Sequence, residues 1–95
     1  MTVHYWIPGP LRSMTGGRSQ VAVAVETAGG SLRDALEGLF AAHPGIRDRV
    51  LTERGEIRHH VNVFVEKTDA RLTGGLATPL ANGMEISIIP AISGG

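Results

Sequence analysis

The chain ends in two glycines, Gly94 and Gly95, which follow a strand-like apolar run over residues 84–89 and a short tail that starts after Pro90. Because glycine has no Cβ, two consecutive glycines can pass through a narrow cleft that a larger residue would block. Five residues beyond Pro90 reach about 17 Å when extended, enough to enter the active site of another protein. This arrangement predicts that the carboxylate of Gly95 is the reactive group and that Gly94 gives it clearance.

Three further Gly-Gly pairs, at residues 16–17, 29–30 and 74–75, weaken any argument from the terminal pair alone. They fall between periodic segments, where glycine pairs are ordinary loop residues. The terminal pair gains weight from its position after a strand and from the lack of a competing chemical motif.

The pair His59-His60 is the first competing candidate, as a metal site. Adjacent residues of an extended segment point to opposite faces, and the chain has no cysteine to complete a ligand set. We therefore predict no metal site. Glu53, Glu56 and Glu66 lack a partner acid at a spacing typical of acid–base catalysis. The sequence also lacks a nucleophilic-serine motif, a phosphate loop and a dinucleotide fingerprint.

Nine basic and nine acidic residues cancel, so the composition predicts neither nucleic-acid binding nor capture by an anionic membrane. Arg54, Arg58 and Arg71 could form a small basic patch, although a solvated surface is the commoner outcome. Without cysteine there is no nucleophilic thiol, so any sulfur that this protein handles must come from a partner. No run reaches the length of a membrane span and no leader is recognisable, which favours the cytoplasm.

In the first half of the chain, the periodicity predicts two strands and a helix. Val3, Tyr5 and Ile7 alternate with polar or outward residues, and three valines alternate over residues 20–26. Ser31, with Asp34 three residues later, is typical of a helix start. The helix then carries a single apolar stripe at helical spacing: Leu32, Ala35, Leu36, Leu39 and Phe40.

In the second half, residues 46–51 predict a short helical turn and residues 61–65 a third strand, closed by a turn at residues 67–69. Residues 71–80 are irregular and could hold a short edge strand or a helical turn. Asn82-Gly83 is a strong turn signal, and it leads into the last strand over residues 84–89.

This order of elements predicts an α+β domain with one main helix packed across a mixed four- to five-stranded sheet. It is the order of the β-grasp, or ubiquitin-like, fold, in which the first and last strands lie parallel at the centre of the sheet. We expect one domain over residues 1–90 and a flexible tail over residues 91–95. The tail would then leave from a rigid strand.

Three segments resemble the MoaD/ThiS superfamily of ubiquitin-like sulfur carriers. Residues 82–95, with the ending Ile92-Ser93-Gly94-Gly95, are similar to the family's C-terminus, and residues 61–65 and 74–80 are most similar to the CysO-type branch of cysteine biosynthesis. The family's common turn, Asp-Gly-Asp-Glu, is replaced here by residues 82–85, Asn-Gly-Met-Glu.

The resemblance implies a partner, an E1-like enzyme that uses ATP to adenylate the carboxylate of Gly95. A sulfur donor would then convert the adenylate into a thiocarboxylate, which donates sulfur to a biosynthetic enzyme for cysteine or another sulfur-containing metabolite. The chain itself would be a protein co-substrate that binds no cofactor, not an enzyme.

Two other functions stay open. The chain could be the small subunit of molybdopterin synthase, with its tail docked in a large catalytic subunit. It could also be a ubiquitin-like protein modifier, or a non-catalytic interaction module.

Alternation along the strands predicts a docking surface. With Ile86 and Ile88 inward, Ile89 faces outward, and Phe64 faces outward on the neighbouring strand. Two apolar side chains on a polar face could form a hot spot for a partner. Within the tail, Ile92 has no core to join unless a partner supplies one. We therefore assign partner binding to Phe64, Ile89, Ala91, Ile92 and Ser93.

Overall fold

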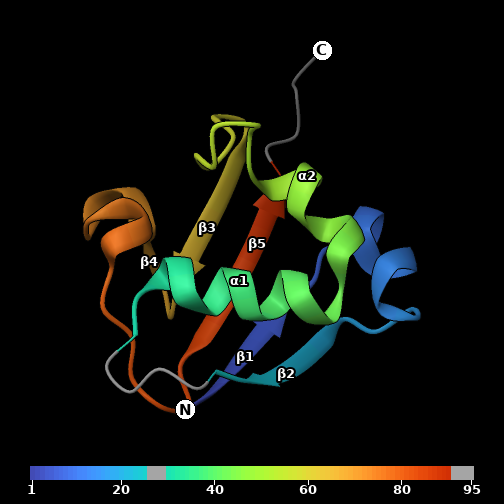
Figure 1. The fold of residues 1–95 in the computed structure, drawn as a ribbon, viewed down its shortest axis with the longest axis horizontal. Coiled ribbons are helices and arrows are strands. Elements are labelled where there is room, and N and C mark those ends of the chain that lie inside the picture. Colours follow the sequence, from blue (N-terminus) through green and yellow to red (C-terminus); the bar gives the residue numbers. More distant parts are fainter. Residues whose placement is uncertain (26–29, 91–95) are drawn as a thin grey trace.

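The computed structural model describes residues 1–25 and 30–90, which form a five-stranded sheet with helix α1 laid across one face (Figure 1). The strand order is β2-β1-β5-β3-β4. The opposite face of the sheet carries no helix within these residues. This architecture confirms the predicted mixed sheet with one main helix.

The two terminal strands lie side by side in the middle of the sheet. Strand β1 (Thr2–Trp6) pairs in parallel with β5 (Glu85–Pro90) and antiparallel with β2 (Gln20–Ala24). On its other side, β5 pairs antiparallel with β3 (Val61–Val65). Strand β5 therefore has a neighbour on both edges, which makes it a rigid element of the sheet.

Helix α1 (Leu32–Ala42) begins where the sequence predicts and buries the predicted stripe. The Asp34 carboxylate accepts hydrogen bonds from the Ser31 backbone N–H at 3.0 Å and from the Ser31 hydroxyl at 3.3 Å. The Tyr5 hydroxyl, on β1, donates to the Ala35 carbonyl oxygen at 2.6 Å. That bond ties the helix to the central strands.

The remaining helical elements are short. Segment η1 (Gly9–Thr15) is a 3₁₀ helix between β1 and β2, while η2 (Pro44–Ile46) and helix α2 (Arg47–Val50) form the predicted second helical turn. Ile46 and Val50 are fully buried beneath it. None of the helices in the described part of the chain is long and apolar enough to cross a membrane.

The turn predicted at residues 67–69 is wrong at Thr68 and Asp69. Thr68–Asp69 form strand β4, which pairs antiparallel with the end of β3, and the chain reverses at Glu66 and Lys67 instead. Glu66 adopts a φ of 58°, in the left-handed region. Its carboxylate accepts from the Glu85 N–H at 2.9 Å and its own N–H donates to the Glu85 carbonyl at 2.8 Å. These two bonds hold the tight reversal.

Residues 70–83 complete the sheet edge and return to β5. The segment contains two 3₁₀ turns, η3 (Ala70–Leu72) and η4 (Gly75–Ala77), so the prediction of a helical turn in this region is confirmed. Gly83 has a φ of 85°, as the predicted Asn82-Gly83 turn requires. The Asn82 side chain accepts the Thr2 N–H at 2.7 Å, which joins the start of β1 to the start of β5.

Candidate docking face and tail root

The face of the sheet turned away from α1 carries three large apolar side chains near the end of β5. Trp6 of β1 lies beside Ser87 of β5, and Phe64 of β3 lies beside the same Ser87 from the other edge. Ile89 follows two residues later on β5, opposite Asn62, and is 41% exposed. Phe64 and Trp6 are partly exposed. We call Trp6, Phe64 and Ile89 the docking face.

The structure brings together the two predicted residues of this face, because Phe64 and Ile89 are diagonal neighbours across β3 and β5. Their role in partner binding stays a prediction. The remaining predicted partner residues, Ala91, Ile92 and Ser93, lie outside the described residues, and so do Gly94 and Gly95.

Sequence reasoning missed Trp6. The alternation that places Val3 and Tyr5 in the core also turns Trp6 outward, so the signal was present in the first strand. Arg12 of η1 lies over the Trp6 ring, with the guanidinium carbon 5.6 Å from the ring centroid, and its Nε donates to the Ile7 carbonyl at 3.1 Å. A cation–π contact of this kind steadies an exposed tryptophan. Only the folded chain reveals Arg12 as its partner.

We call Pro90, the last described residue, the tail root. A small groove opens beside it, away from the docking face. Its volume is about 170 Å³. Most of its wall is apolar, formed by Pro10, Leu11, Val61, Ile88 and Pro90. The polar side chains of Arg49 and His60 complete the lining. Pro90 pairs with Val61. Pro90 therefore lies between an apolar groove and the docking face.

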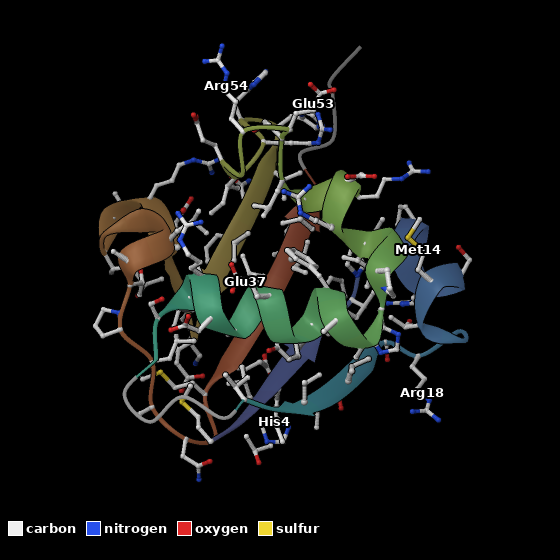
Figure 2. All side chains as sticks on the ribbon, viewed as in Figure 1. His4, Met14, Arg18, Glu37, Glu53 and Arg54 are labelled. Carbon is white, nitrogen blue, oxygen red and sulfur yellow. The ribbon has the colours of Figure 1, made fainter. Side chains whose placement is uncertain are left out.

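The three arginines considered as a basic patch have different environments. Arg58 donates through Nε to the Asp48 carbonyl at 2.9 Å, and Arg71 is held by three acceptors. Arg54 projects away from the fold at the end of the molecule towards which β5 runs, beside Glu53 (Figure 2). Two of the three guanidinium groups are thus hydrogen-bonded to oxygen atoms within the fold.

Titratable groups give no sign of a catalytic centre in the described part of the chain. The His59 and His60 rings meet edge to face with centroids 5.5 Å apart, and no group of three or more metal-ligating side chains gathers within residues 1–25 and 30–90. Burial raises the pKa of Tyr5 to about 12. Tyr5 is 1% exposed and bonded to α1, so this shift reflects its place in the core.

Comparison with known proteins identifies the family. The sequence model of the ThiS family matches residues 5–95. The sulfur carrier protein CysO of Mycobacterium tuberculosis is 37% identical over 97 residues, and the alignment covers 100% of both chains. Small archaeal modifier protein 1 of Haloferax volcanii is 37% identical over 86 residues, covering 90% of this chain and 91% of that protein.

The fold is shared with solved structures of such proteins. A chain in the crystal structure of the BexX/CysO complex of Amycolatopsis orientalis superposes with a TM-score of 0.83 at 32% identity, covering 98% of this chain and 99% of that one. The predicted β-grasp fold and the predicted class, a sulfur carrier that serves as a co-substrate, are both confirmed. The chain belongs to the ThiS family.

Proposed function

We propose that the carboxylate of Gly95 is the sulfur-carrying group of this protein. In the first step a carboxylate oxygen attacks the α-phosphorus of ATP in an E1-like enzyme, and pyrophosphate leaves. In the second step the sulfur of hydrosulfide attacks the carbonyl carbon of the acyl-adenylate, AMP leaves, and loss of a proton gives the thiocarboxylate. Adenylation is needed because an ionised carboxylate resists attack by another nucleophile.

The observation that carries this proposal is the pairing of β5, the strand that directly precedes the tail. Strand β5 is paired with β1 on one edge and β3 on the other, and its last residue, Pro90, is still paired with Val61. A tail that starts from such a strand has a fixed origin, which reduces the entropy lost when it enters a partner's active site. The full-length alignment with a named sulfur carrier supports the same reading.

The docking face provides the second half of the recognition. Ile89 directly precedes Pro90, and Trp6 and Phe64 pair with Ser87, three residues before Pro90. Aromatic and aliphatic side chains of this kind supply much of the binding energy at protein interfaces. In this proposal the face first contacts the E1-like enzyme and later the sulfur acceptor, in the cytoplasm, where ATP is available.

The test is the intact mass of the protein after incubation with ATP, sulfide and an E1-like enzyme from the same organism. We expect a gain equal to the sulfur-for-oxygen difference, on the peptide that ends in Gly95. The control is a chain with one alanine appended after Gly95, which should fold normally and gain no sulfur. Sulfur incorporation into the extended chain would contradict the proposal, as would no gain in wild type with an enzyme proven active on another carrier.

The acceptor pathway is a separate part of the proposal. The similarity to CysO favours an enzyme that makes cysteine or a related metabolite. A small subunit of molybdopterin synthase would instead remain bound to a large subunit. Co-purification from the native host distinguishes the two, because we expect transient capture of an acceptor and not a stable heteromer.

One finding favours a second candidate function. Small archaeal modifier protein 1 is 37% identical, the same percentage as CysO, although the match spans 86 residues instead of 97. The same adenylated Gly95 could be transferred to a lysine amine of another protein, forming an isopeptide with loss of AMP. Lysine peptides that carry the C-terminal residues of this chain, found by mass spectrometry in host cells, would establish that function.

A further inference from the structure

Strand β4 covers only part of the outer edge of β3. Its two residues pair with Phe64 and Val65 (Figure 1). Within residues 1–25 and 30–90, the structure places no strand against the beginning of β3 on that edge. Edge groups left without a neighbour destabilise a strand end or invite a foreign strand, so they need another partner.

The side chain of Arg71 takes the place of the missing strand. Its Nη2 donates to the Val61 carbonyl at 2.8 Å and to the Arg58 carbonyl at 3.0 Å, while Nη1 donates to Oδ1 of Asn62 at 3.0 Å. The Val61 N–H itself donates to the Arg58 carbonyl at 2.9 Å. A planar guanidinium can reach three acceptors at once, which a lysine ammonium on its flexible stem does poorly.

The local sequence explains why Arg71 points along this edge. It lies in the 3₁₀ turn η3, directly after β4, and its backbone N–H is capped by Oδ1 of Asp69 at 2.9 Å. The other carboxylate oxygen of Asp69 is 4.0 Å from Nη1. The turn therefore sends the side chain back beside β3, where Asp69 helps to hold it.

The residues that Arg71 holds are the register partners of the last two residues before the tail. Val61 pairs with Pro90, and Asn62 pairs with Ile89 of the docking face. We infer that Arg71 is a positioning residue for sulfur loading, which fixes the end of the β3–β5 ladder and so fixes the tail root and Ile89 together. This inference rests on the proposed function for its effect on activity, and on the contacts above for its effect on the ladder.

We call the three hydrogen bonds of the Arg71 guanidinium the clamp. Without the clamp, the end of the β3–β5 ladder would open locally. Docking to the activating enzyme would then have to order that end again, and the ordering cost would appear as weaker binding. Once the tail is seated, the reaction at Gly95 would proceed as before. The expected signature is thus a raised KM for the carrier with little change in kcat.

The experiment compares Arg71→Met and Arg71→Lys with wild type in the activation assay at 20 °C, together with amide hydrogen exchange. We expect kcat/KM to fall on the order of fivefold for both variants, mainly through KM. Exchange should rise at residues 61–62 and 89, but not in the β1–β2 ladder. Arg54→Met is the matched control, since it removes an exposed arginine from the same end of the molecule and should leave KM unchanged.

A second control separates positioning from general stability. Tyr5→Phe removes the hydroxyl bonded to α1, away from the tail root, and should lower thermal stability without raising KM. A KM increase in Tyr5→Phe equal to that in Arg71→Met would overturn the inference. Full activity in Arg71→Lys would also overturn it, because charge alone, and not the three-acceptor clamp, would then suffice.

The hydrogen-exchange measurement stands without the activity assay. If wild type gained no sulfur at all, the proposed function would fail, yet local opening at residues 61–62 and 89 would still support the clamp. Unchanged exchange at those amides in both variants would remove its structural basis, whatever the assay showed.

Discussion

At the scale of single residues, Tyr5 couples stability to alkaline pH. Burial raises its pKa to about 12 in the folded protein, against about 10 in the unfolded chain. The folded state therefore holds the proton more tightly, and this contribution is complete below pH 10 and lost as the pH rises towards 12.

We expect the urea midpoint to fall between pH 10 and pH 12 in wild type and to fall much less in Tyr5→Phe. Phenylalanine lacks the ionisable hydroxyl but fills the same core position, so the variant also reports the alkaline effect of every other group. Parallel pH profiles for the two proteins would show that Tyr5 does not cause the alkaline loss.

At the scale of elements, the outer face formed by β1, β5 and β3 should behave as one binding surface. Trp6→Ala removes its largest side chain, and truncation of a hot-spot residue costs about 2 kcal/mol or more in binding. We expect the KM of the activating enzyme for this carrier to rise roughly tenfold or more, with kcat nearly unchanged. Isothermal titration against the same enzyme provides an independent measure of the binding loss.

Leu72 offers the control for that surface. It is 81% exposed but lies in η3, outside the strands that carry Trp6, Phe64 and Ile89. Leu72→Ser should therefore leave KM unchanged. An increase in KM as large as that of Trp6→Ala would mean that the partner contacts the η3 edge as well. The docking face would then have to include η3.

At the scale of the whole molecule, the strong periodic signals predicted the fold. The valine alternation in β2 and β3 and the stripe from Leu32 to Phe40 define the buried faces because each repeats over several residues. A two-residue strand such as β4 has no period, so Thr68 and Asp69 looked like part of a turn.

The docking face was predicted at Phe64 and Ile89 but not at Trp6, although the alternation along β1 already turns Trp6 outward. The contacts of Arg71 depend on which residues make the chain reversal, and the sequence placed that reversal at residues 67–69 instead of 66–67.

The docking face and the tail root together should determine how far the Gly95 carboxylate reaches into the partner. Both are fixed to the same ladder, through the pairs Asn62–Ile89 and Val61–Pro90, so the distance from the face to the reactive carboxylate depends on the number of residues after Pro90. Deleting Ala91 shortens the extended reach by about 3.4 Å. Since even a 1 Å misplacement of reacting groups can cost about a hundredfold in rate, we expect kcat for sulfur loading to fall at least that far.

The deletion leaves β5 and its pairing intact, so thermal stability should not change, and KM should rise little because the docking face is untouched. Ala91→Ser keeps the length of the tail and should load sulfur at the wild-type rate. If the shortened chain also loaded sulfur at that rate, the partner would have to recognise the carboxylate independently of the docking face. The rigid mount that β5 provides would then be a feature of the fold without a role in delivery.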